Sequence, residues 1–222
     1  SLTAGDFDGD GDIDFLAGNL GDNMQFSASE TEPMRYYIQD IDNNGRIDPI
    51  LTYYINGVSY PLPTRDELLG QVPTLKKKYG SYEAYAQVNT ESFLTENAIK
   101  PRFTLEISHL KSSFIENLGN GNFELKALPF LAQNSAIQDF VFEDFDGDGK
   151  KEILAAGNLF PLRVGIGRMD ASFGTLLKFE NNAFKISEKQ NQLWLSGDIK
   201  CLNIMKFNSG KKELLVTRND DK

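Results

Sequence analysis

The stretch that decides the fold is Asp6-Phe7-Asp8-Gly9-Asp10-Gly11-Asp12-Ile13-Asp14. Its arrangement recurs at residues 40–48 (DIDNNGRID) and at residues 144–152 (DFDGDGKKE). Each copy has an oxygen-bearing side chain at positions 1, 3, 5 and 9, and a glycine at position 6. Ordinary polar turns are rich in Asp and Gly but need no such fixed spacing. We therefore treat the three stretches as one repeated loop.

This spacing predicts a calcium site in each loop. Calcium takes about six to eight hard oxygen ligands, and a tight loop can direct side chains inward at positions 1, 3 and 5. Glycine permits the sharp bend, after which the position-7 carbonyl and the position-9 side chain complete the shell. Magnesium fits less well because it retains more water. The candidate ligands are Asp6, Asp8, Asp10, Asp12, Asp14, Asp40, Asp42, Asn44, Arg46, Asp48, Asp144, Asp146, Asp148, Lys150 and Glu152.

The residues around the loops favour strands over the helices of an EF-hand. An EF-hand closes with a glutamate at position 12, where this chain has Ala17, Leu51 and Ala155. At position 7 only the backbone carbonyl is needed, which explains the arginine and lysine there. Short runs that precede or follow the loops are typical of buried strands. These runs are residues 15–17, 35–39, 49–54, 138–142 and 153–156.

A longer repeat surrounds the loops. Residues 15–20 (FLAGNL) match residues 153–159 (ILAAGNL), and residues 204–216 form a decayed copy that we expect to bind no calcium. Residues 113–125 and 175–186 each predict a second hairpin. Four short strands per repeat is the pattern of a β-propeller blade. The predicted fold class is therefore all-β, with the blades of a partial propeller.

A helical insertion interrupts the repeat, because loop starts 40 and 144 lie 144 − 40 = 104 residues apart. Thr64 and Glu67 form a predicted capping box, and Ser81 and Thr90 are candidate caps of two further helices. We expect three regions. Residues 1–63 would hold blades with loops one and two, residues 64–100 the helical insertion, and residues 101–222 blades with loop three and the degenerate fourth loop.

Composition excludes several classes of function. The net charge of −9 disfavours a nucleic-acid partner, which would need a basic face. Cys201 and His109 are the only cysteine and histidine, so a zinc site with several such ligands is impossible. The sequence contains no apolar run long enough to cross a bilayer. It also begins without a recognisable signal peptide, and we expect it to be a fragment of a longer protein.

Other polar residues leave alternatives open. The stretch 168–172 (RMDAS) could bind a polar ligand or simply shape its loop. Lysines 76–78 could touch an anionic surface or form a solvated helix face. The tyrosines at 53, 54, 79, 82 and 85 could contact a sugar or protein ligand, or pack the insertion onto a blade. Glycan-active catalysis would need acids outside the loops to converge, and the candidates are Glu106, Asp139, Asp170 and Asp198.

Beyond the loops, several motifs carry a resemblance. They are residues 19–21 (NLG), 48–51 (DPIL), 60–61 (YP), 65–68 (RDEL) and 167–172 (GRMDAS). With the loops, they resemble the FG-GAP/VCBS repeats of integrin-α-type β-propellers, and in particular a bacterial subgroup similar to cartilage acidic protein. The resemblance implies calcium-stabilised blades in an exported protein that binds proteins or glycans. The chain is too short for a closed seven-bladed ring.

Together these features predict a calcium-stabilised repeat module outside the cytoplasm, in the periplasm, at the cell surface or secreted. We expect up to three Ca²⁺ ions, no catalytic residues, and a protein or carbohydrate ligand at rim loops. A glycan-active enzyme and a structural subunit of a cell-surface assembly are the alternatives. The sequence leaves the ligand, the number of blades and the oligomeric state open.

Overall fold

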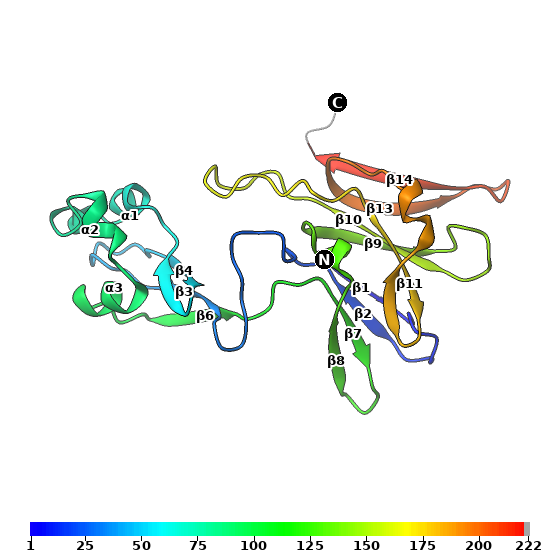
Figure 1. Ribbon diagram of the computed structural model, residues 1–222, viewed down its shortest axis with the longest axis horizontal. Coiled ribbons are helices and arrows are strands. Elements are labelled where there is room, and N and C mark those ends of the chain that lie inside the picture. Colours follow the sequence, from blue (N-terminus) through cyan, green and yellow to red (C-terminus); the bar gives the residue numbers. More distant parts are fainter. Residues whose placement is uncertain (220–222) are drawn as a thin grey trace. The chain divides into compact units, whose positions relative to one another are not determined.

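The computed structural model describes residues 1–219, which form mainly antiparallel β-structure (Figure 1). The strands make four small sheets, and none of them closes on itself within these residues. The chain divides into two compact units. Unit 1 contains Ser1–Gln25 and the chain from Leu110 onward, and unit 2 contains Phe26–His109. The predicted β-rich class is confirmed.

The first sheet of unit 1 is assembled from two distant parts of the sequence. Its strand order is β1-β2-β7-β8, and every neighbouring pair is antiparallel. The chain leaves this sheet after β2 and re-enters it at β7, so unit 2 is an insertion between two paired strands. The strands are β1 (Leu2–Gly5), β2 (Asp14–Ala17), β7 (Ser113–Asn117) and β8 (Phe123–Ala127).

Two further sheets complete unit 1. Four strands that follow one another in sequence and pair antiparallel form the second sheet, and a single hairpin from the decayed repeat forms the third. The second contains β9 (Ile137–Glu143), β10 (Glu152–Gly157), β11 (Thr175–Glu180) and β12 (Ala183–Ile186), and the third β13 (Asp198–Lys206) and β14 (Lys212–Asn219). The 3₁₀ helices Phe130–Gln133 and Glu188–Gln192 lie in the connections. The strand pairs predicted around residues 113–125 and 175–186 are confirmed.

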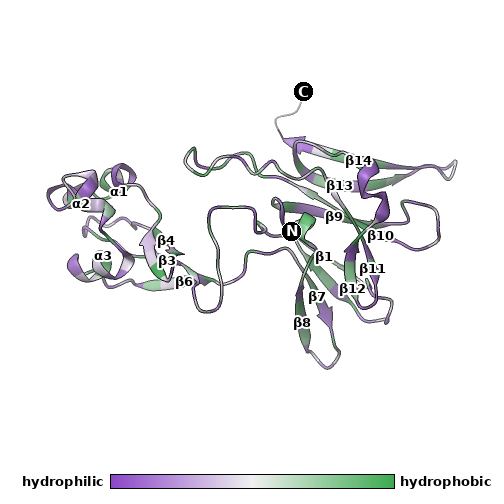
Figure 2. Ribbon diagram, in the orientation of Figure 1, coloured by the Kyte–Doolittle hydropathy of each residue, from purple (hydrophilic) through white to green (hydrophobic). Residues whose placement is uncertain are grey.

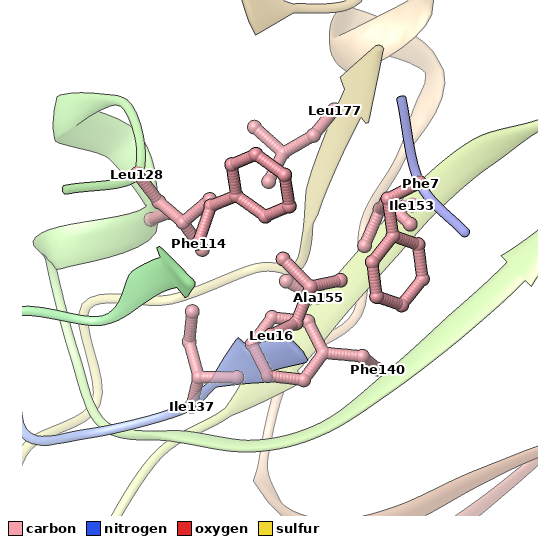
Figure 3. Packing of buried hydrophobic residues seen from close by; sticks show 10 residues of the cluster. Phe7, Leu16, Phe114, Leu128, Ile137, Phe140, Ile153, Ala155 and Leu177 are labelled. Atoms are coloured by element: carbon pink, nitrogen blue, oxygen red, sulfur yellow. The ribbon is translucent and has the colours of Figure 1, made fainter. Parts of the chain in front are cut away.

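The core of unit 1 explains the unbroken apolar run in β10. All six residues of this strand are buried. Ile153 and Ala155 pack into one apolar cluster, whereas Leu154 and Ala156 pack into a second cluster with residues of β13. Because both faces of β10 are covered, its sequence does not alternate. Figure 3 shows the first cluster, which contains Phe7, Leu16, Phe114, Leu128, Ala132, Ile137, Phe140, Ile153, Ala155 and Leu177.

Unit 2 combines one sheet with short helices. The sheet order is β5-β4-β3-β6, so the last strand returns to pair with the first. The strands are β3 (Met34–Ile38), β4 (Ile50–Ile55), β5 (Val58–Pro61) and β6 (Phe103–Ile107). The helices are α1 (Arg65–Gln71), the 3₁₀ helix Pro73–Lys77, α2 (Tyr82–Ala86) and α3 (Thr90–Glu96).

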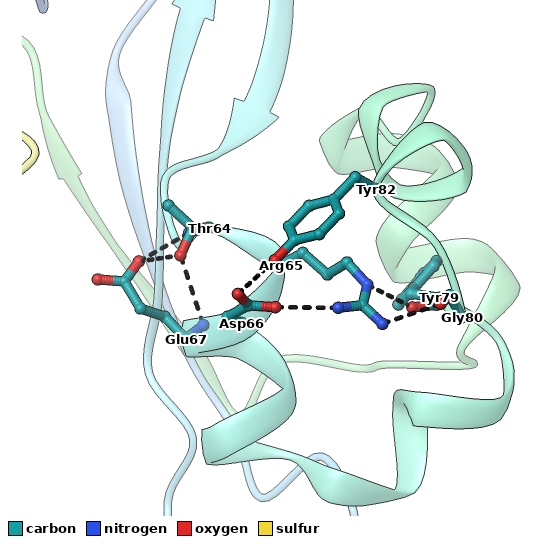
Figure 4. A network of polar contacts seen from close by, with 7 residues as sticks. All are labelled: Thr64, Arg65, Asp66, Glu67, Tyr79, Gly80 and Tyr82. Atoms are coloured by element: carbon teal, nitrogen blue, oxygen red, sulfur yellow. Dashed lines mark hydrogen bonds and ion pairs between the residues drawn. The ribbon is translucent and has the colours of Figure 1, made fainter.

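The helix starts follow local capping chemistry. Thr64 and Glu67 form the predicted capping box (Figure 4), and Ser81 caps α2 as expected. The prediction for α3 was wrong by one residue, because the Asn89 side chain accepts from the Ser92 amide and Thr90 is the first helical residue. Asn is at least as good a cap as Thr, since its side-chain oxygen reaches the same amide groups.

Unit 2 begins and ends outside the insertion expected at 64–100. The structure instead groups the second acidic loop and the helices in one unit. Ile50, from the strand after that loop, packs in the same apolar cluster as Leu68, Val72 and Phe93. Burial of these side chains against one another joins sheet and helices, since each large apolar side chain contributes roughly 1.5–3 kcal/mol when buried. The helical insertion expected at 64–100 therefore lies inside unit 2, together with the second loop and its strands.

Hydropathy along the helices bears on membrane insertion. Helices α1, α2 and α3 carry both hydrophilic and hydrophobic residues (Figure 2). Within residues 1–219, no helix has the length and apolar character needed to span a bilayer.

Candidate metal centres

Each acidic loop joins two paired antiparallel strands. The first connects β1 to β2, the second β3 to β4, and the third β9 to β10. The prediction of strand, loop and strand is therefore confirmed at all three places, and no helix flanks a loop. Because the strand ends are held by the ladder, the loops start and finish at fixed separations.

The first residue of each loop binds the backbone of the glycine at position 6. In every copy one carboxylate oxygen accepts a hydrogen bond from that amide, and the other accepts from an amide at position 4 or 5. These two hydrogen bonds fold the chain into a closed turn around the carboxylate. The distances to the glycine amide are 3.2 Å from Gly11 to Asp6, 2.8 Å from Gly45 to Asp40, and 3.0 Å from Gly149 to Asp144.

Positions 3 and 5 continue the same pattern. In the first loop Asp8 accepts from the Asp10 amide at 3.1 Å, and Asp10 accepts from the Asp12 amide at 2.8 Å. The alternate side chains are thereby turned toward the inside of the bend. The other loops repeat both bonds, with acceptors Asp42, Asn44, Asp146 and Asp148.

Position 9 is buried, unlike most of the loop. Asp14, Asp48 and Glu152 are 0%, 4% and 5% exposed. Each accepts a hydrogen bond from the amide at position 2 of its own loop, at 3.2, 3.0 and 2.9 Å respectively. Burial raises the pKa of Asp48 and of Glu152 above its usual range, and neighbouring loop carboxylates raise it further. These residues therefore anchor the closing end of the loop at a cost in desolvation.

Two residues of each loop adopt left-handed backbone conformations, which favour glycine. Position 6 has φ of +97° in Gly11, +85° in Gly45 and +88° in Gly149, as its expected role requires. Position 4 also has positive φ, although sequence reasoning assigned it no role. The signal was present, because position 4 is occupied by Gly9, Asn43 and Gly147, and Asn tolerates this region better than most residues.

The loops bring carboxylates together in three groups. In each group, oxygens from three residues lie within 4.8 Å of one another. The groups combine positions 1, 3 and 5 in the first loop, and positions 1, 3 and 9 in the other two. They are Asp6, Asp8 and Asp10; Asp40, Asp42 and Asp48; and Asp144, Asp146 and Glu152.

Asp14 is outside the first group. One of its oxygens accepts from Phe7, and the other accepts from the Asn117 amide on β7 at 2.9 Å. Asp14 therefore ties the first loop to the strand that follows the inserted unit. The backbone carbonyls of Asp12, Arg46 and Lys150 stay predicted ligands.

The donor chemistry of the groups suits a hard cation. All side-chain donors are oxygens, and each group contains three carboxylates with no lysine or arginine among them. Like charges at such separations repel one another, and a divalent cation reverses that repulsion. Hard oxygen donors in this number are typical of calcium, whereas zinc favours nitrogen and sulfur.

The degenerate fourth loop lacks this chemistry. It is a tight turn between β13 and β14, closed by a 2.9 Å hydrogen bond from the Phe207 amide to the Lys211 carbonyl. Nearby, Lys212 makes a 2.8 Å ion pair with Glu143, the residue before the third loop. No group of three carboxylates gathers at this turn in the described part of the chain.

The stretch 168–172 shapes its own loop. Arg168 pairs with Asp170 at 3.2 Å. Buried Asn158 donates to the Ser172 and Gly197 carbonyls at 2.9 and 2.8 Å, and accepts from the Ser172 amide at 3.1 Å. Asn158 is thus the residue that organises this region, and its only sequence signal was its place in the repeated GNL motif.

Lys78 and several tyrosines of unit 2 are engaged within the protein. Lys78 pairs with Glu96 at 3.1 Å, while Tyr79 and Tyr85 pack in the apolar cluster. Tyr82 is exposed and donates to Asp66, which also pairs with Arg65 (Figure 4). Packing of the insertion therefore accounts for much of its aromatic content.

The acids proposed for glycan catalysis are not gathered at one cavity. Glu106 pairs with Arg35 in unit 2 at 2.7 Å. In unit 1, Asp139 accepts from the Leu202 amide at 2.8 Å, and Asp198 pairs with Lys200 at 2.6 Å. None of these carboxylates lines a cavity described for residues 1–219.

Comparisons with known proteins give no match to a family model, a curated protein or a solved structure. The resemblance to FG-GAP/VCBS repeats therefore rests on the sequence motifs, and the function must be argued from the loops themselves.

Proposed function

We propose that this chain is a calcium-stabilised binding module of the FG-GAP/VCBS type, built from propeller blades, whose ions are structural and not catalytic. One observation carries the proposal. Three loops share one spacing, one set of hydrogen bonds between side chains and backbone, and one position between paired strands, and each gathers three carboxylates within 4.8 Å.

The stabilisation would come from binding to the folded state alone. The unfolded chain holds the carboxylates apart, so calcium has no comparable site there. Binding then adds RT ln(1 + [Ca]/Kd), or roughly 1.4–2.7 kcal/mol per site at ten to a hundred times Kd. Three sites would be comparable with the whole stability of a domain, which is about 5–15 kcal/mol.

The positions of the loops say what the ions would hold. Each ion would fasten the ends of two adjacent strands, β1 with β2, β3 with β4, and β9 with β10. Asp14 would extend this effect to β7 through its bond to Asn117. The remaining loops and the helices of unit 2 are then free to provide surface for a protein or carbohydrate ligand.

A location outside the cytoplasm fits this chemistry. Calcium loops of this general kind are often of micromolar to millimolar affinity, which resting cytosolic calcium fills poorly. We therefore propose a periplasmic, cell-surface or secreted protein, and the net charge of −9 argues against nucleic acid as its partner.

A thermal melt with calcium or with EDTA tests the metal proposal. Calcium is expected to raise the melting temperature by several degrees, because about 1 kcal/mol corresponds to roughly 2–8 °C for domains of this size range. Asp144→Asn is expected to reduce the rise. The matched control is Asp170→Asn, since Asp170 is an exposed carboxylate outside the three groups. Equal midpoints in calcium and EDTA would refute structural calcium.

A further inference from the structure

A cavity of about 500 Å³ lies in unit 2, where the sheet meets α3. Its volume is within the range of roughly 300–1,000 Å³ that is usual for small-molecule sites. Strands β3, β4 and β5 provide one part of its lining and the start of α3 provides another. The lining residues used below are Arg35, Tyr37, Tyr54, Ser59, Thr90 and Glu91.

The cationic side of the cavity is held in place by its neighbours. The Nε of Arg35 donates to Glu106 at 2.7 Å, and its Nη1 donates to the Tyr54 hydroxyl at 3.1 Å. Glu106 raises the pKa of Arg35, so the guanidinium stays charged. A guanidinium fixed by two partners loses little conformational entropy when it binds a third group, which favours recognition.

The opposite side is fixed by a second contact. The Ser59 and Thr90 hydroxyls lie 2.8 Å apart and join β5 to the first residue of α3. Thr90 is buried and Ser59 is half-buried, so this bond is partly shielded from water. Sheet and helix are thereby linked at the cavity, and the site is formed before any ligand arrives.

The charges of the lining favour no ion of one particular sign. Arg35 and Glu91 bring one positive and one negative charge to the cavity, so this pair gives the lining no net charge. Glu106 also balances Arg35 directly. The cavity is therefore best suited to an uncharged ligand that can both donate and accept hydrogen bonds.

Two tyrosines define the shape of that ligand. Tyr37 and Tyr54 offer flat apolar rings with polar hydroxyl ends. A sugar ring matches this combination, because it has an apolar C–H face and hydroxyls at its edge. We propose that the cavity binds a neutral oligosaccharide. This inference rests on the proposed function as a binding module and assigns its ligand class.

Isothermal titration of the whole chain in excess calcium tests the assignment. The neutral probes are cellotetraose, maltotetraose, mannotetraose and N-acetylchitotetraose, and the charged probes are tetragalacturonate and tetralysine. We expect at least one neutral probe to bind with Kd below about 1 mM. Tyr54→Phe removes a hydroxyl, and Glu91→Gln replaces a charge-assisted acceptor with a neutral amide; each is expected to raise that Kd about five- to tenfold.

Matched controls separate the cavity from the rest of unit 2. Tyr60→Phe alters the opposite face of the sheet, since Tyr60 pairs with Tyr53 and Ser59 pairs with Tyr54. Glu83→Gln makes the same change as Glu91→Gln, but in the first turn of α2. Both controls should leave Kd within about twofold. If Tyr54→Phe fails to fold, the exposed Glu91 decides the result.

Three outcomes would overturn the assignment. They are no binding of a neutral probe, binding of a charged probe alone, and a Kd that the cavity variants do not change more than the controls. A calcium-dependent melt recorded on the same samples keeps the two proposals apart. Absence of sugar binding with an intact calcium-dependent melting shift refutes only the proposed sugar site. Sugar binding without a calcium-dependent shift refutes only the proposed structural calcium.

Discussion

At the scale of single residues, the loop spacing serves two purposes with the same carboxylates. Asp6, Asp8 and Asp10 each accept hydrogen bonds from backbone amides, and these bonds fold the loop. The same three residues form the group of carboxylates in the first loop. A carboxylate has several lone pairs, so an oxygen that accepts an amide can still face a cation. The amide bonds arrange the donors in advance, which reduces the ordering cost of binding a metal.

Tyr85 shows how burial in unit 2 creates pH dependence. Its hydroxyl donates to the Pro63 carbonyl at 2.8 Å, and its ring packs edge-on against Tyr79. Burial, assisted by nearby groups, raises the pKa of Tyr85 to about 12 from 10.0. Between about pH 10 and 12 the folded state therefore keeps the phenol proton of Tyr85, which the unfolded chain has lost. The contribution of Tyr85 to folding stability is complete below about pH 10 and is lost as pH rises from about 10 to 12.

Replacing Tyr85 with phenylalanine should remove this dependence. Tyr85→Phe is expected to lower stability near pH 8 by about 1 kcal/mol, because the bond to Pro63 is lost. Between about pH 10 and 12 the variant should lose stability less steeply than the wild type. Urea unfolding at a series of pH values measures both effects. Parallel stability profiles above pH 10 would contradict the prediction.

At the scale of elements, the repeated GNL motif marks the end of a buried strand. A Cβ on Gly157 would lie 1.9 Å from the Ala136 carbonyl oxygen, and one on Gly18 would lie 2.5 Å from the Ile137 carbonyl oxygen. The consecutive residues Ala136 and Ile137, at the start of β9, thus pass against both glycines. The glycines allow the ends of β2 and β10 to approach this backbone closely, and Asn158 then fixes the following loop.

Gly157→Ala is therefore expected to be strongly destabilising. Backbone cannot move aside as a flexible side chain can, so the added methyl should cost about 2–4 kcal/mol. Gly165→Ala is the matched control, because nothing lies within 4 Å of a Cβ there. Chemical denaturation of the two variants measures the difference. Similar midpoints for both would show that the close approach does not constrain the strand.

At the scale of the whole molecule, the insertion of unit 2 between β2 and β7 separates two cores along one chain. The cluster around Ile153 lies in unit 1, and the cluster around Leu68 lies in unit 2. Units with separate apolar cores can unfold separately. Two acidic loops belong to unit 1 and one belongs to unit 2.

Calorimetry should consequently resolve two unfolding transitions with different calcium responses. Asp40→Asn is expected to reduce the calcium-dependent shift of the unit 2 transition by roughly 1.4–2.7 kcal/mol and to spare the other. Asp144→Asn should reduce the calcium-dependent shift of the unit 1 transition and leave that of unit 2 unchanged. Hydrogen exchange identifies which unit each transition represents. A single cooperative transition that both substitutions affect equally would contradict this division.

The sequence by itself determined the local features. Spacing within nine residues predicted the loops, short apolar runs beside them predicted the strands, and the Thr64–Glu67 pair predicted the start of α1. These features depend on contacts between residues close in the chain, so short patterns specify them. The carboxylates that the structure groups are all among the residues that the loop spacing names.

Only the tertiary structure decided how these parts combine. Pairing of β2 with β7 joins residues about a hundred positions apart, as Leu16 with Phe114 illustrates. The same pairing directs an oxygen of Asp14 to Asn117 and leaves Asp14 outside the first carboxylate group. Packing of Ile50 in one cluster with Leu68 of α1 placed the second loop in the same unit as the helices. Such contacts depend on side-chain burial between distant segments, for which a single sequence has no fixed spacing.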